Sequence, residues 1–203
     1  MGEANEARKK KTVVILQILI SALLGFAAGY FLISRLLFGD WGFTDVFLFF
    51  VFVIAGIFIS VNVHEAGHLI LGKLNGYKFV SYRVGFIALN NENGKIKFSV
   101  MKNAGYMGLC AMIAPEKGIP RFNHLLYYSG GILFNILFGI VLIVFKNIIS
   151  LQDLLNMSLT MTLVFSVLLG IINFIPFFSG NNPSDGKIIW SIILGKPFSK
   201  KLM

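Results

Sequence analysis

The sequence predicts an all-α polytopic membrane protein of about four transmembrane helices with a small membrane-associated β-hairpin. Hydrophobic residues make up 56% of the 203 positions and charged residues only 13%, whereas soluble domains carry about a quarter charged residues. The apolar residues gather in stretches of about 20 or more, the length that a helix needs to cross a bilayer. Four such spans and a short non-helical region fill the chain, so we expect one domain over residues 1–203.

The predicted spans lie at about 12–38, 43–74, 124–148 and 154–179. The first follows a basic run and is too long for the apolar core of a signal peptide, so we expect it to be retained. The second carries several polar residues in its C-terminal half. After the fourth span, residues 186–194 are expected to form a short interfacial helix.

Between the second and third spans the pattern changes to alternation. Hydrophobic residues occupy every second position over 80–86 and again over 96–100, and Asn91 to Gly94 can form a turn. Alternation on both sides of a turn is typical of a β-hairpin. We expect the hairpin at about 77–101, followed by an irregular connection to the third span.

The basic residues indicate the orientation of the spans. All 18 Lys and Arg residues except Arg35 and Lys146 lie in segments that this arrangement places on one side of the membrane. Basic residues favour the cytoplasmic side, so we expect both termini and the hairpin there. Topology explains the net charge of +9, and no basic patch interleaved with aromatic residues suggests a nucleic acid. The single cysteine, Cys110, excludes an intramolecular disulfide.

The polar residues of the second span form the HExxH pattern His64-Glu-Ala-Gly-His68. Two histidines four residues apart lie on one face of a helix and can bind the same metal ion. Glu65 lies beside such an ion and can accept a proton from a water molecule that the metal activates. The alternative is that these polar residues occur together on the helix surface by chance and bind no metal. It is disfavoured because an ionisable group at bilayer depth costs about 3 kcal/mol on insertion scales.

A catalytic zinc site usually has three protein ligands, so one more is required. Asp185 is the best placed acidic residue, because it follows the cytoplasmic end of the fourth span, at the depth where the HExxH helix ends. Taken alone, the local sequence Pro183-Ser-Asp-Gly favours a solvated turn residue instead.

These motifs resemble the site-2 protease family of intramembrane zinc metalloproteases, in the compact form that lacks a PDZ domain. The resemblance covers most of the chain after Phe43. Its specific part is HExxH near the cytoplasmic end of one span, followed by a later span that runs into Asn173-Phe-Ile-Pro176 and then Asp185-Gly186.

A further segment, Gly131 to Asn135, is similar to a Gly-Pro-x-x-Asn signature of that family, with Ile132 in place of proline. The connection that precedes Asp185 is longer than usual in the family. This departure leaves Asn181, Asn182 or a water molecule as lesser alternatives for the third ligand.

The resemblance implies one zinc ion bound by His64, His68 and Asp185, Glu65 as general base, and Asn135 and Asn173 as polar supports of the catalytic site. The two asparagines are explained equally well as hydrogen-bonding contacts between helices. The implied activity is that of a zinc endopeptidase in regulated intramembrane proteolysis, which hydrolyses peptide bonds in or near transmembrane segments of membrane-anchored substrates.

A peptide bond in a helix must be unwound before it is cut, so the substrate then needs new backbone partners. An exposed strand of the hairpin can supply them by pairing with the substrate; alternatively, the hairpin only covers the cytoplasmic mouth of the site. We expect a membrane-anchored peptide and the lipid bilayer as partners, and a bacterial cell membrane as the location. The sequence does not decide whether the chain forms a homo-oligomer.

Two other functions fit parts of the pattern. A metal-ion transporter of the ZIP type also carries a similar histidine motif in a span, but it resembles this chain less, because such transporters have more spans and a second metal motif. A catalytically silent scaffold is disfavoured by Glu65, since a structural zinc site needs no base beside it.

Overall fold

A computed structural model describes residues 26, 29–30, 33–34, 41–101, 107–116, 118–179 and 182–197. The chain divides into two units, Met1–Val51 and Phe52–Met203, and the second contains all the candidate site residues. The predicted span at about 12–38 lies outside the described residues, apart from a few helical positions.

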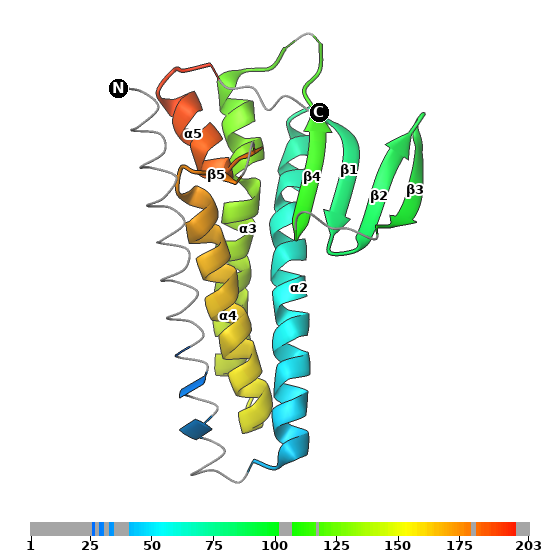
Figure 1. Ribbon diagram of the computed structural model, residues 1–203. Helices are drawn as coiled ribbons and strands as arrows, with labels where there is room; N and C mark the ends of the chain where they lie inside the picture. Colours follow the sequence, from blue (N-terminus) through cyan, green and yellow to red (C-terminus); the bar gives the residue numbers. More distant parts are fainter. Residues whose placement is uncertain are drawn as a thin grey trace, which may run out of the picture. The chain divides into compact units, whose positions relative to one another are not determined.

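Three of the described helices are long and apolar enough to cross a membrane. They are α2 (Phe43–Leu74), α3 (Arg121–Ile148) and α4 (Asp153–Phe174), with 32, 28 and 22 residues (Figure 1). At a rise of 1.5 Å per residue, even the shortest is about 33 Å long, against about 30 Å for the hydrocarbon core of a bilayer. These helices coincide with the last three predicted spans.

The end of α4 comes earlier than expected. We predicted a span to about 179, but the helix ends at Phe174 and Ile175 is extended, with φ −68° and ψ 132°. Pro176 follows, and a proline disfavours the helical conformation of the residue before it. The chain can therefore turn back toward the site directly after α4.

Glycines allow α2 to approach its neighbours closely. A Cβ atom on Gly67 would lie 2.6 Å from the carbonyl carbon of Gly130 on α3, and one on Gly56 would overlap the side chain of Thr162 on α4. Helices pack this closely only where small residues meet, as is common in membrane proteins. The close crossing of α2 and α3 lies at the level of the HExxH motif.

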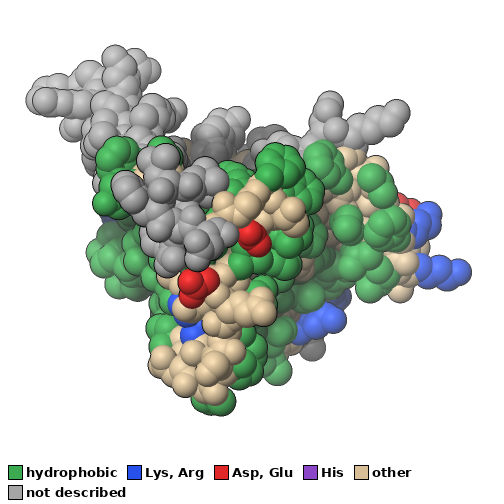
Figure 2. All heavy atoms as spheres, turned by 90° about the horizontal axis from the view of Figure 1, so that it is seen from below, with side chains coloured by type: hydrophobic (Ala, Val, Ile, Leu, Met, Phe, Trp, Pro, Cys, Tyr) green, Lys and Arg blue, Asp and Glu red, His purple; other side chains and the backbone are tan. Residues whose placement is uncertain are grey.

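The outward surfaces of the helices are apolar. Ile136, Ile140 and Val144 of α3 are large exposed hydrophobic residues. In Figure 2, which shows the molecule from below, hydrophobic side chains lie along the sides of its outline. Contiguous apolar surface of this extent marks an interaction site rather than a surface made for water. It agrees with integration of these helices into a membrane.

A four-stranded antiparallel sheet replaces the predicted hairpin. Its strands are β1 (Lys78–Val84), β2 (Ile87–Glu92), β3 (Lys95–Val100) and β4 (Gly108–Ile113), in the order β3-β2-β1-β4. The turn expected at Asn91 to Gly94 is present between β2 and β3. The expectation of only two strands was wrong, because Gly85, with φ +58°, makes an additional turn within the alternating stretch. The connection after the hairpin was expected to be irregular, but it contains the fourth strand, β4.

The remaining described elements follow α4. They are β5 (Phe178–Ser179), β6 (Asn182–Pro183) and the helix α5 (Asp185–Ile193). Ile188, Ile189 and Ile192 of α5 are buried in a core cluster that also contains Tyr127 of α3 and Met112 of β4. A helix was expected at 186–194, and α5 covers nearly this range; its buried isoleucines pack against the core, which places its first residue, Asp185, at the site.

Candidate metal centre

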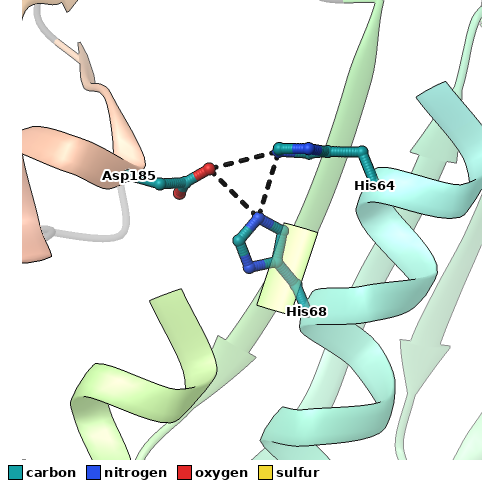
Figure 3. Close-up of side chains that lie close together, drawn as sticks. All are labelled: His64, His68 and Asp185. Atoms are coloured by element: carbon teal, nitrogen blue, oxygen red, sulfur yellow. Dashed lines mark hydrogen bonds and ion pairs between the residues drawn. The ribbon is translucent and has the colours of Figure 1, made fainter. Parts of the chain in front are cut away.

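The two histidines of HExxH point from α2 toward the start of α5 (Figure 3). His64 and His68 are 4% and 5% exposed, and Asp185 is 8% exposed. Oδ2 of Asp185 lies 3.2 Å from Nε2 of His64 and 3.1 Å from Nε2 of His68, and the two Nε2 atoms are 3.3 Å apart. The fold thus brings the three predicted ligands together in one buried cluster.

The spacing of these donor atoms fits a zinc ion. With zinc–ligand bonds of about 2.0–2.1 Å, tetrahedral geometry separates neighbouring ligand atoms by about 3.3 Å. The observed separations are 3.1–3.3 Å. Two imidazoles and one carboxylate are a donor set of catalytic sites, which keep a fourth position for water or substrate. The cluster can therefore hold a metal ion.

Ser184 fixes the position of Asp185 at the start of α5. The Ser184 hydroxyl accepts a hydrogen bond from the N–H of Lys187 at 3.1 Å, as an N-cap does. It also donates to the carbonyl of Ile175 at 2.8 Å and accepts from the N–H of Phe177 at 3.1 Å. Asp185 is thus the buried first residue of a helix and not a solvated turn residue.

Gly186 holds the start of α5 against the end of α4. A Cβ atom at this position would lie 2.9 Å from the main-chain oxygen of Asn173 and would overlap that of Phe174. The extra chain length before Asp185 forms the short strands β5 and β6. The longer connection therefore does not displace the carboxylate from the histidines.

The surroundings of Asp185 favour its charged form. Burial alone raises the pKa of the carboxyl group, but the adjacent imidazoles of His68 and His64 lower it by more, so that the pKa lies well below its usual value. The N-terminal end of α5 also favours a negative charge. The carboxylate is the form that binds a metal ion.

The second ring nitrogen of each histidine is also held. Nδ1 of His68 lies 2.8 Å from the carbonyl oxygen of Tyr127, so it carries the proton and leaves Nε2 free to bind. Nδ1 of His64 lies 3.2 Å from the amide of Asn135. Oδ1 of this fully buried Asn135 has no hydrogen-bond partner among the described residues. Turning the amide over would let Oδ1 accept from His64 Nδ1, as metal binding at Nε2 requires.

Gly131 of α3 leaves room for the donor atoms. A Cβ atom there would lie 2.5 Å from both Cε1 and Nε2 of His64, and 2.6 Å from Nε2 of His68. Real Cβ atoms essentially never approach other atoms so closely. The backbone of α3 therefore forms a wall of the metal centre, and only glycine fits in it.

Glu65 lies between the metal centre and the sheet. Its side chain is buried, and a Cβ atom on Gly108, the first residue of β4, would lie 2.5 Å from Oε1. On the same side of α2, the hydroxyl of Tyr82 donates to the main-chain oxygen and to Oδ1 of Asn62 at 2.9 Å. The sheet is thus fastened to α2 beside the predicted general base.

A sequence model of peptidase family M50 matches residues 52–154, about half of the chain. The chain belongs to peptidase family M50. This is the site-2 protease family, whose members are zinc metalloproteases, and no PDZ domain was detected. The resemblance drawn from the motifs is thereby confirmed. No curated protein and no solved structure matches the chain.

The other asparagine predicted for this M50 peptidase is placed differently from Asn135. Nδ2 of Asn173 donates to the carbonyl of Leu169 in its own helix at 3.0 Å. Among the described residues, no hydrogen bond joins its side chain to the three donors. A role for Asn173 as a polar support of the site stays a prediction.

Three contributions to the site were missed from the sequence. Ser184 could have been recognised, because a serine directly before an Asp-Gly pair and an apolar run is a helix N-cap signal. Gly108 lies beside Glu65 only because β4 exists, and the strand was not expected. The Tyr127 carbonyl belongs to the main chain, so no residue pattern indicates it.

Proposed function

We propose that this M50 peptidase is an intramembrane zinc endopeptidase that hydrolyses peptide bonds in or near transmembrane segments of membrane-anchored substrates. The observation that carries the proposal is the cluster of His64 Nε2, His68 Nε2 and Asp185 Oδ2, with separations of 3.1–3.3 Å inside a group of membrane-length helices. Membership of a metalloprotease family agrees with it.

These three atoms would hold the ion. Bound zinc would supply Lewis-acid chemistry, by activating a water molecule and polarising the substrate carbonyl. The Glu65 carboxylate accepts the proton of the attacking water and delivers it to the leaving amide nitrogen. Asn135 acts as a positioning residue, since its amide holds the ring of His64.

Substrate binding is proposed to use the sheet. An unwound transmembrane segment needs partners for its backbone N–H and C=O groups. Among the described strands, β4 pairs only with β1, so its second edge has no strand partner. The first residue of β4, Gly108, lies beside Glu65. A substrate strand that pairs with this edge lies next to the general base. We further propose that the sheet is membrane-associated, because Phe86, Phe98 and Val100 expose apolar side chains.

The proposed setting is a bacterial cell membrane, in which the chain acts as one domain with its termini and active-site end toward the cytoplasm. His68 lies near the Lys73 end of α2, whereas Lys146 lies at the far end of α3. The excess of basic residues at the first of these ends supports this orientation.

The test combines zinc content with cleavage of a panel of transmembrane peptides in detergent. Wild type is expected to bind one zinc ion and to cut. Glu65→Gln should keep zinc without cutting, because the amide cannot accept the proton, and Asp185→Ala should lose both. Glu92→Gln is a matched control, since Glu92 is an exposed acid of β2 that pairs with Lys97.

Each failure has a distinct meaning. Full zinc binding by Asp185→Ala would show that the third ligand is another residue. Cleavage by Glu65→Gln at the wild-type rate would show that Glu65 is not the general base. A wild-type protein without zinc would overturn the protease proposal, and zinc flux into vesicles without proteolysis would indicate a transporter.

A further inference from the structure

The outer face of α5 consists of Trp190, Ile193 and Leu194. These three side chains are 39%, 56% and 60% exposed, and their spacing of three and four residues places them on one side of the helix. The buried isoleucines of α5 lie on the opposite side, against the core cluster. The helix is therefore apolar on both sides, and its outer face requires an apolar environment other than the core.

Trp190 lies where a membrane-length helix ends. Its ring packs against that of Phe174, the last residue of α4, with 5.9 Å between the centroids. Because α4 is about 33 Å long, its ends lie near the two boundaries of a hydrocarbon core of about 30 Å. Tryptophan is enriched at this boundary, between acyl chains and headgroups. The outer face of α5 therefore lies at the level of the lipid headgroups.

Two exposed basic residues lie at the C-terminal end of this face. Gly195, with φ +67°, ends α5, and the N–H of Lys196 donates to the carbonyl of Ser191 at 2.9 Å, which holds Lys196 at the end of the helix. Arg121 comes from the start of α3. A Cβ atom on Gly195 would lie 3.4 Å from Nη1 of Arg121. The guanidinium group thus lies one residue away from Lys196.

No acidic residue close in the sequence neutralises these two cations. The chain has no Asp or Glu over residues 117–152 and none after Asp185. Within the described ranges, no hydrogen bond or ion pair engages the side chain of Arg121 or Lys196. Two neighbouring positive charges repel each other, and a bound anion relieves the repulsion. A phosphate group suits Arg121 in particular, because it accepts two parallel hydrogen bonds from a guanidinium group.

We propose that the outer face of α5, together with Arg121 and Lys196, binds anionic phospholipids of the leaflet around this end of the helices. The headgroup phosphate meets the two cations, and the acyl chains meet Trp190 and its apolar neighbours. A free phosphate would satisfy the cations alone and leave the apolar side chains in water. A phospholipid satisfies both parts of the surface.

The test uses Trp190 as a fluorescent reporter in the full-length protein. Trp41 and Trp190 are the two tryptophans of the chain, so Trp41→Phe leaves a single signal. The protein is reconstituted in bilayer discs that contain phosphatidylglycerol and phosphatidylcholine, and one lipid at a time carries brominated acyl chains, which quench tryptophan on contact. We expect brominated phosphatidylglycerol to quench Trp190 more strongly than brominated phosphatidylcholine at the same share of the lipid.

The basic residues are tested by Arg121→Gln and Lys196→Gln in the same background. A basic residue near an anionic membrane surface raises the affinity by about fivefold, so each change should lower the preference for phosphatidylglycerol by about that factor. Lys95→Gln is the matched control, because Lys95 is an exposed lysine of β3 and not part of this surface. It should leave the preference unchanged.

Three results would overturn the proposal. Equal quenching by the two brominated lipids would show no preference for anionic lipid. Absence of quenching by either would show that another part of the protein covers Trp190. An equal loss of preference in Lys95→Gln would show that only the overall charge matters.

A salt titration of the Trp41→Phe protein tests the same point in case a glutamine variant does not fold. Because salt screens exposed charges, the preference for phosphatidylglycerol should fall as salt rises, and a preference that salt leaves unchanged would refute binding through Arg121 and Lys196. None of these measurements requires cleavage, so their outcome is separate from that of the protease proposal.

Discussion

Replacing Gly131 by alanine is expected to remove metal binding and leave α3 folded. The added Cβ would lie 2.5 Å from Cε1 and Nε2 of His64 and 2.6 Å from Nε2 of His68. It strikes the two donor atoms themselves, and not the flexible end of a side chain. The histidines cannot retreat freely, because Tyr127 and Asn135 hold their other ring nitrogens.

The size of the effect follows from the distances. A carbon atom packs at about 3.5–4.0 Å from its neighbours, so the donors or the α3 backbone must move by about 1 Å. Metal sites tolerate errors of about 0.2 Å in ligand distance, and a misplacement of about 1 Å among catalytic groups costs on the order of 100-fold in reaction rate. We expect cleavage to fall by at least about 100-fold, and zinc affinity to fall because the donors are displaced beyond the tolerance of a metal site.

The assay is zinc affinity by competition with a chelator, together with helix content and cleavage rate. Gly139→Ala is the control, because it makes the same change in the same helix where the added Cβ meets only the side-chain ends of Val167 and Leu163, at 3.0 and 3.2 Å. Both changes raise helix propensity by about 1 kcal/mol. A Gly131→Ala protein that binds zinc as tightly as Gly139→Ala would refute the placement of the donors against α3.

Asn135→Ala should weaken zinc binding by about 10- to 100-fold, as loss of a hydrogen-bond partner of a ligand does; chelator competition measures this, and unchanged affinity would mean that the amide does not orient His64. Ser184→Ala should lower the free energy of unfolding by about 1 kcal/mol or more, since an N-cap and two further bonds are lost; thermal unfolding measures this, and an unchanged midpoint would contradict the capping role. Asn173→Ala should leave zinc content unchanged, because Asn173 bonds within its own helix, and metal analysis checks this.

The helices that carry the histidines and the asparagines could be predicted from the sequence because their signals are local. A long uncharged stretch forms a helix in a membrane whatever lies around it, and HExxH places two imidazoles on one face through helix geometry alone. The last three predicted spans therefore coincide with α2, α3 and α4. The end of α4 was placed too late because the effect of Pro176 on the preceding residue was not taken into account.

The sheet was predicted less well, because alternation does not show where a strand turns. Val84 and Phe86 continue the alternating pattern across Gly85, which has a positive φ and reverses the chain. β4 has little alternation of its own, with the sequence Gly-Leu-Cys-Ala-Met-Ile. Its pairing with β1 is a long-range contact, so the edge beside Glu65 could not be located from the sequence.

The contributions of α3 to the site explain why sequence patterns identify ligands more readily than supports. α3 supplies none of the three donor atoms, yet Tyr127, Gly131 and Asn135 surround both histidines. Asn135 is visible as a polar residue in a span, and Gly131 as a small residue at a close approach. The Tyr127 carbonyl gives no signal in the sequence, because every residue has a main-chain carbonyl. Side-chain changes in α3 therefore test how the histidines are oriented and how much space they have, without removing a donor atom. Replacing His64 and His68 of α2 or Asp185 of α5 removes the donor itself.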